Sequence, residues 1–490
     1  MAMARETELR DLKATIRNKL SSEPTSLPEI HSFPIESLPL EIITEIFLHC
    51  IPEYDWDSLI APSSAPLLLL RVCRAWRQLA LSTPKLWRIF HIQDPFDASG
   101  QAFTPAEEQE KFEQLAGVMD AWFERAGGCS VQVTLADVDW QTGPQAIAPF
   151  YQSLQRNSAQ IGGLSLLSTP TALVEISRLR LALPRLERLK FSVAGSDEDD
   201  PELELGLFFQ CPHLRSLHIS GVPLSSVPLN LPQLTELRSY SYLASQTIEF
   251  LRRAPAVRRA ILNSKMFAED QAGVSDLVHP AMHDLTLVDD IGSEPDVPPL
   301  LSSLTLPSLH ILKIWSLSID FDIKLVERLV QRSRCTLRQL EFHPHVATSL
   351  VSMECFRAPY LSSLTLLDIS FPTSETITYL FEGYGSDAAY LPQLEELRFM
   401  YEGKTELIQH AVHSSAVALL KREALVPVAA HASVAGAGAP VKQLRVFKLV
   451  ICKDFEKVDF EGMAGDLLHF LDLRKRGVSV HIGKLYLSVV

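Results

Sequence analysis

The sequence predicts an α/β fold in which a small N-terminal three-helix unit precedes an irregular solenoid of strand–helix repeats with a curved parallel sheet. Two observations predict it. An eight-residue motif recurs from residue 184 to residue 399 at intervals of 20 to 33 residues, with apolar residues at its third and sixth positions. Ahead of this array, apolar residues between 38 and 87 recur every three or four residues. A solenoid accommodates 490 residues without one very large core.

The N-terminal helices are predicted from two apolar stripes. Leu38-Pro39 stands where a first helix begins, because proline is tolerated in a first helical turn. A second apolar run starts at Leu67, continues through Trp76 to Ala80, and ends at Thr83-Pro84. Such a small unit barely buries its own apolar surface, so we expect a permanent partner to complete it.

The order of four motifs in this region resembles an F-box. The motifs are Leu-Pro-x-Glu-Ile from Leu38, Ile-Phe from Ile46, Val-Cys-Arg-x-Trp-Arg from Val72 and Ser-Thr-Pro-x-Leu-Trp from Ser82. The sequence is most similar to the F-box-like proteins of mushroom-type fungi. The resemblance implies an F-box-like domain over 34–92 that docks on a Skp-type adaptor of an SCF (Skp–cullin–F-box) ubiquitin ligase, a cullin-RING enzyme.

By the same resemblance, nine residues would form or support the adaptor-binding face: Leu38, Pro39, Ile42, Ile46, Val72, Cys73, Trp76, Leu86 and Trp87. The alternative is that these residues only make a small helical core, because apolar stripes at helical spacing are usually core.

The flanking segments are predicted as follows. Residues 1–33 comprise a helix over 4–20 and a linker. Residues 93–156 form a helical and strand transition that caps the array. There, a helix opens at Thr104 with Glu107 as its capping-box partner and breaks at Gly127-Gly128, and a strand follows over 130–138 because apolar and polar residues alternate.

The array itself, over 157–490, resembles leucine-rich repeats, because the period and the Leu-x-x-Leu-x-Leu pattern match. Return helices are predicted at 244–253 and 323–332, weaker repeats at 161–166 and 444–449, and a helix and strand in the terminal cap at 463–490. The segment near 411–440, helical at first and then rich in Ala and Gly, is interpreted as a flexible insertion.

Candidate substrate-binding residues lie between the core positions of each repeat, because alternate strand residues face outward. The seventh motif position is a column of Lys190, His218, Arg238, Ile261, Thr286, Lys313, Glu341, Thr365, Arg398 and Lys448. Its five Lys and Arg residues against one Glu suggest an acidic or phosphorylated protein partner. The next outward column suggests an apolar anchor around Trp315 and Met400. The alternative is that basic strand residues only balance acidic loops.

Composition and motifs exclude other functions. The net charge of −14 argues against nucleic-acid binding. No catalytic, metal or cofactor signature stands out, and His343/His345 and His410/His413 lack a third ligand at a recognisable spacing, so we expect no enzyme. Scattered cysteines, no signal peptide and no membrane-spanning apolar run predict a soluble intracellular protein, cytoplasmic or nuclear.

Together these observations predict a non-catalytic substrate receptor: the F-box docks on the adaptor and the repeats hold a target protein. The alternative is a leucine-rich-repeat scaffold without a ubiquitin-ligase role, because a fold alone does not fix function.

Overall fold

The computed structural model describes residues 38–52, 61–93, 104–138, 144–193, 211–222, 226, 231–264, 274–289, 297–316, 323–344, 356, 359–370, 374–401, 406–434, 442–451, 458–484 and 487–488. They form two compact units. The N-terminal unit comprises Pro28–Tyr242 with Arg253–Val257, and the C-terminal unit comprises Leu243–Arg252 with Arg258–Val490. The predicted helix at 4–20 and its linker lie outside the described residues.

In the described part of the N-terminal unit, four short helical elements come first. The predicted first helix is confirmed. The predicted second helix is wrong as a single element, because it divides at Cys73, whose backbone is extended at φ −154° and ψ 174°. The elements are α2 (Leu40–His49), α3 (Leu69–Val72), α4 (Arg74–Leu81) and the 3-10 helix η2 (Pro84–Trp87).

Side chains satisfy the backbone groups that the break at Cys73 exposes. The Trp76 backbone N–H donates to Cys73 Sγ at 3.4 Å, which caps the start of α4. Arg77 Nε donates to the Leu70 carbonyl at 2.7 Å, which partners an end group of α3. Local side-chain bonds of this kind compete with a continuous helix, and apolar spacing alone does not reveal them.

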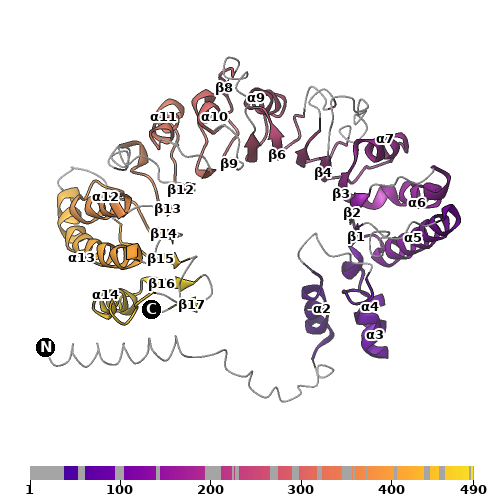
Figure 1. The fold of residues 1–490 in the computed structure, drawn as a ribbon, viewed down its shortest axis with the longest axis horizontal. Coiled ribbons are helices and arrows are strands. Elements are labelled where there is room, and N and C mark those ends of the chain that lie inside the picture. The colour runs from indigo at the N-terminus through magenta and orange to yellow at the C-terminus, as the bar shows by residue number, and fades with distance from the viewer. Residues whose placement is uncertain are drawn as a thin grey trace. The chain divides into compact units, whose positions relative to one another are not determined.

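The six strands described in the N-terminal unit are parallel, and each lies beside the next one in the sequence (Figure 1). The strand at 130–138 is confirmed, and β1 was not predicted. The elements are β1 (Ile89–Gln93), α5 (Pro105–Ala126), β2 (Val131–Val138), α6 (Pro144–Asn157), η3 (Ser158–Gln160), β3 (Ile161–Ser168), α7 (Pro170–Arg178), β4 (Arg188–Val193), β5 (Ser216–Ser220) and β6 (Glu236–Tyr242).

Helix α5 has the predicted ends. Thr104 and Glu107 form a reciprocal capping box at its start, and Gly127 closes it at φ 57°, which an L side chain rarely adopts. Its buried face carries Trp122, whose ring packs edge-on against Trp87 at a centroid distance of 4.8 Å. The N-terminal helices are therefore continuous with the core under the first strands.

The C-terminal unit repeats the same pattern. Its main strands are parallel and in chain order, except that β17 is antiparallel to β16, and β8 and β10 form a small separate pair. The return helices at 244–253 and 323–332 are confirmed, as are the helix and strand of the terminal cap. The elements are α9 (Ala244–Arg253), β7 (Arg259–Ser264), β8 (Leu277–Val278), β9 (Asp284–Asp289), α10 (Val297–Ser303), β10 (Leu304–Thr305), β11 (Ile311–Ser316), α11 (Lys324–Ser333), β12 (Gln339–Pro344), η7 (Pro359–Leu361), β13 (Leu366–Ser370), α12 (Ser374–Ser386), β14 (Glu396–Tyr401), α13 (Glu406–Val434), β15 (Val446–Ile451), α14 (Ala464–Lys475), β16 (Ser479–Lys484) and β17 (Leu487–Ser488).

The repeat frame predicted at residue 359 is wrong by three residues. Leu366 in β13 pairs with Gln339, and Asp368 pairs with both Glu341 and Arg398. The Leu364 N–H donates to the Leu361 carbonyl, just as the third motif residue does in other repeats. The frame therefore starts at residue 362, and the outward column contains Asp368 where the prediction placed Thr365.

The predicted flexible insertion near 411–440 is wrong for its first part. Helix α13 runs from Glu406 to Val434 and packs against α12 and α14, while 435–440 lie outside the described residues. Small residues allow this close packing: a Cβ added at Gly385 of α12 would lie 2.9 Å from Ala418 Cα. Gly385 and Ala418 therefore let α12 and α13 pack closely against each other.

Among the described residues, no helix is both long enough and apolar enough to cross a lipid bilayer.

Candidate functional site

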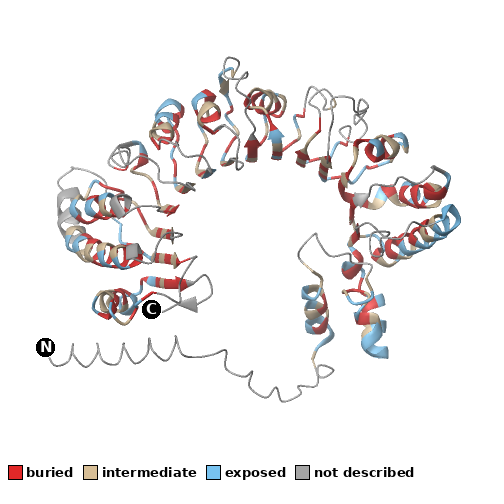
Figure 2. Cartoon of the chain, in the orientation of Figure 1, coloured by how far each residue is buried: buried red, intermediate tan, exposed pale blue. Residues whose placement is uncertain are grey.

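The described N-terminal helices expose several large apolar side chains. On α2, Ile43 and Phe47 are buried, but Ile42 on the neighbouring face is 47% exposed and Ile46 is half-buried. Figure 2 shows α3 and α4 largely in the colour of exposed residues. We call the following set the helical surface: Leu40, Ile42, Leu68, Val72 and Leu81, all exposed.

The nine predicted adaptor-contact residues fall into two groups. Seven lie at or near the helical surface: Pro39, Ile42, Val72 and Cys73 are exposed, and Leu38, Ile46 and Trp76 are half-buried. Leu86 and Trp87 are fully buried. These two residues can support a binding surface but cannot contact a partner directly.

Sequence reasoning missed the exposed Leu40, Leu68 and Leu81. These three residues could have been included from the sequence, because they belong to the same apolar runs as the predicted residues. What the sequence did not reveal is how α2 turns toward α4, where the rings of Phe47 and Trp76 lie 4.8 Å apart.

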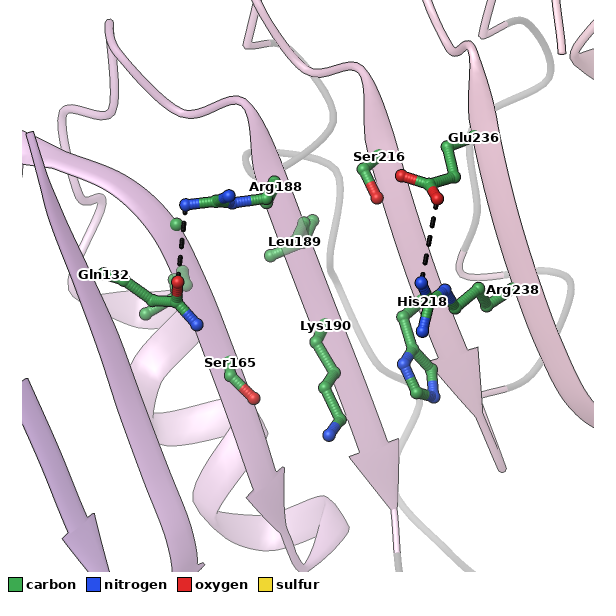
Figure 3. Close-up of a pocket in the computed structure, with 11 residues that line it drawn as sticks. Gln132, Ser165, Arg188, Leu189, Lys190, Ser216, His218, Glu236 and Arg238 are labelled. Atoms are coloured by element: carbon green, nitrogen blue, oxygen red, sulfur yellow. Dashed lines mark hydrogen bonds and ion pairs between the residues drawn. The ribbon is translucent and has the colours of Figure 1, made fainter. Parts of the chain in front are cut away.

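A second candidate site is a hollow on the outward strand face of the N-terminal unit (Figure 3). It has a volume of about 410 Å³, within the range of ligand-binding clefts. We call it the basic hollow. The residues that line it come from β2 to β6: Gln132, Gly163, Leu164, Ser165, Arg188, Leu189, Lys190, Ser216, His218, Glu236 and Arg238.

Strand register brings three predicted residues together in the basic hollow. Lys190 of β4 pairs with His218 of β5, and His218 pairs with Arg238 of β6. On the other side of Lys190 lies Ser165 of β3. Three of the seven candidate substrate-binding residues therefore lie on consecutive strands.

Sequence reasoning missed one basic residue of this hollow, Arg188. Arg188, two residues before Lys190, faces the same way because strand side chains alternate. Its guanidinium donates to Gln132 Oε1 at 3.3 Å, and the Arg238 guanidinium lies 3.7 Å from Glu236. Figure 3 shows both contacts. Arg188 and Glu236 occupy the fifth motif position, so reading that position along the array would have identified both residues from the sequence.

The charges in the hollow are unbalanced. Arg188, Lys190 and Arg238 face one carboxylate, Glu236, which gives a net charge of +2 while His218 is neutral. Within the part of the chain that the structure describes, neither Arg188 nor Lys190 forms an ion pair. The hollow is thus a locally cationic site on a protein whose net charge is −14.

Burial, and then the charges of Lys190 and Arg238, lower the pKa of His218 to about 4. We therefore expect His218 to stay neutral down to pH 5, and Lys190→Met to raise its pKa. Because the unfolded chain binds this proton more readily, His218 should make the fold less stable as the pH falls from about 6.5 toward 4. An NMR titration of the histidine ring protons checks the pKa. If the pKa of His218 did not change in Lys190→Met, the placement of the Lys190 ammonium close to the His218 ring would be contradicted.

Two of the three basic residues that the predicted column places in the C-terminal unit, Lys313 and Arg398, have carboxylate partners. Lys313 Nζ lies 2.8 Å from Glu341, and Arg398 lies 2.7 Å from Glu396. The corrected frame adds Asp368, whose pKa is raised by burial. The continuous basic row predicted along the whole array is therefore interrupted in this unit.

The predicted apolar anchor is also divided. Trp315 is 46% exposed and Met400 is half-buried, but β12 and β13 separate their strands, which places them roughly 14 Å apart. Ser370 pairs with Met400, where the predicted frame placed Leu367. Leu367 is a core residue, so the two anchors do not form one patch.

The histidines named in the sequence have other partners. His410 contacts the Thr378 hydroxyl at 2.8 Å, His413 contacts Asp466 at 3.0 Å, and His343 lies 3.6 Å from Asp368. His345 lies outside the described residues. No group of three or more potential metal ligands occurs within the described ranges.

Comparison with known proteins identifies no family for this chain. No protein-family model matches the chain, and no curated protein matches its sequence.

Proposed function

We propose that this chain is a non-catalytic substrate-recognition subunit of an SCF-type ubiquitin ligase. The helical surface docks on a Skp-type adaptor, and the strand face of a leucine-rich-repeat array holds the target protein. Ubiquitin transfer is then performed by other subunits. The chain contributes proximity, because holding the target raises the effective concentration of its lysines near the charged ubiquitin carrier.

The uncovered face of α2 carries the proposal. Ile43 and Phe47 complete the internal packing, yet Ile42 on the neighbouring face stays exposed, with Val72 exposed on α3. Several exposed large apolar side chains on one small helical unit are typical of a protein–protein interface. The order of F-box-like motifs supports a Skp-type adaptor as the partner.

The repeated parallel strands support the second half of the proposal. Each motif places a strand beside its predecessor in both units, with outward side chains in register. Such columns offer an extended surface for a protein segment. The same geometry also suits a scaffold without a ligase role, so adaptor binding is the deciding property.

An adaptor-binding assay tests the proposal. Wild-type chain should bind a recombinant Skp-type adaptor from a mushroom-type fungus, and Ile42→Asp should weaken the complex by about 2 kcal/mol, roughly 30-fold in Kd, because it places a charge in an apolar interface. Calorimetry or biolayer interferometry measures both constants.

The matched control is Val118→Asp on α5, which also places a charge on an exposed apolar residue of the same unit. It should leave adaptor affinity within twofold of wild type. Absence of adaptor binding by the wild-type chain would remove the ligase proposal, and equal losses in the two variants would remove the assigned surface.

A further inference from the structure

We propose that the basic hollow of the N-terminal unit binds the phosphate group of a phosphorylated serine or threonine side chain in the recruited target. This inference rests on the proposed function and names the chemistry of its ligand.

The charge of the hollow matches a phosphate monoester. Arg188, Lys190 and Arg238 exceed the single carboxylate of Glu236 by two positive charges. A phosphorylated side chain carries a charge between about −1.5 and −2 at neutral pH and three strong acceptor oxygens. One acidic side chain would carry half of that charge and would leave donors of the hollow without an acceptor.

The donors come from separate strands. Lys190 and Arg238 lie on β4 and β6, two strand spacings or roughly 10 Å apart, with His218 and Ser216 on β5 between them. Figure 3 shows Arg238 extending back beside His218. Long cationic side chains from two sides can therefore reach one phosphate above β5, where the neutral His218 ring and the Ser216 hydroxyl offer further donors.

Small residues keep the site open. Gly163 and Ser165 of β3 and Ser216 of β5 line the hollow where larger side chains would fill it. The hollow of about 410 Å³ admits a phosphate and part of the chain that carries it. An extended peptide can cross the strand face and place one modified side chain there, which is why we commit to a protein ligand and not to a free metabolite.

A peptide-binding measurement with the full chain tests the inference. The probe is an immobilised peptide pool with phosphoserine at its centre and mixed residues on either side, compared with the same pool carrying serine. We expect at least about tenfold tighter binding of the phosphorylated pool, because charge-assisted bonds to phosphate are the strongest available contacts.

Two variants of the hollow should abolish this preference. Arg188→Gln/Lys190→Gln/Arg238→Gln removes the charges. Ser216→Trp blocks the space and retains every charge. The matched control removes three cations from exposed ion pairs on helices, as Arg178→Gln/Arg252→Gln/Lys475→Gln. The control should keep the full preference for phosphate, and thermal melts confirm that each variant is folded.

Four results would overturn the inference: equal binding of the two pools, equal loss of preference in the hollow and control triple variants, full preference in a folded Ser216→Trp variant, or competition by free O-phosphoserine at concentrations as low as those of the peptide. The last result would assign the hollow to a small metabolite. A rise in the pKa of His218 on peptide binding, seen by NMR, supports the inference independently of affinity.

Adaptor binding is measured separately on the same samples. Loss of phosphopeptide binding with adaptor binding intact would end the ligand assignment and leave the ligase proposal standing. The reverse result would end the ligase proposal and leave the phosphate site standing.

Discussion

Trp87→Ala should lower the free energy of unfolding of the N-terminal unit by about 3–5 kcal/mol, the range seen when a buried tryptophan is truncated. Trp87 is fully buried, and its indole N–H donates to the Ala80 carbonyl at 2.9 Å. Its ring packs edge-on to Trp122, and the Arg125 guanidinium lies 4.6 Å from its centroid. Hydrogen exchange should rise across α4, η2 and α5 together, because this one side chain joins them.

The matched control for this loss is Trp315→Ala. Trp315 is substantially exposed on the outward strand face, so its truncation should change stability by no more than about 0.5 kcal/mol. Trp87→Phe should fall between the two, because it retains a ring but removes the donor to Ala80. If denaturant unfolding showed equal losses in Trp87→Ala and Trp315→Ala, the packing of the N-terminal helices on α5 would be contradicted.

Most strands could be predicted because one local pattern encodes each of them. In the repeat that starts at Pro184, Leu186 and Leu189 are core residues, and β4 begins at Arg188. Strand β1 could not be predicted in this way, because it precedes the array. Its sequence, Ile-Phe-His-Ile-Gln, becomes a strand by pairing with β2 and burying Phe90. Tertiary pairing, and not local pattern, determines that segment.

Two overlapping frames explain the error at residue 359. Pro359-Tyr-Leu-Ser-Ser-Leu-Thr-Leu fits the motif, and so does the stretch that starts at Ser362 and uses Leu364 and Leu367. The structure uses the second frame, which buries Leu367 completely and leaves Leu366 only half-buried. A three-residue slip preserves the leucine pattern but reverses which strand residues face outward, so the composition of a site column depends on register.

The basic hollow was only half predictable for a related reason. The sequence identified Lys190, His218 and Arg238 as one column, and register confirms that they are neighbours. It did not indicate that Lys190 pairs in register with the neutral His218, whereas Lys313 lies beside Glu341 of the neighbouring strand and forms an ion pair with it. Pairing across strands decides which cations remain available for a ligand, and that pairing depends on contacts between repeats.

Arg422→Leu should lower the free energy of unfolding of the C-terminal unit by about 3–5 kcal/mol, because it leaves buried carbonyl groups without donors. Arg422 of α13 is buried, and its guanidinium donates to the Asp387 carbonyl at 2.7 Å and to the Leu391 carbonyl at 3.2 Å. It also donates to the Tyr384 carbonyl at 3.3 Å and lies 4.6 Å from the centroid of that ring. One cation thus satisfies the end of α12 and the turn that leads to β14.

Lys421→Leu is the matched control, because it removes the neighbouring cation from an exposed position of the same helix. It should change stability by no more than about 0.5 kcal/mol. Arg422→Lys should be intermediate, since an ammonium cannot reproduce the planar fork of donors. Urea denaturation of the three variants measures these differences. Were 411–425 a flexible insertion, Arg422→Leu and Lys421→Leu would have equally small effects. A large difference between them would show that this alanine-rich segment is part of the structural core.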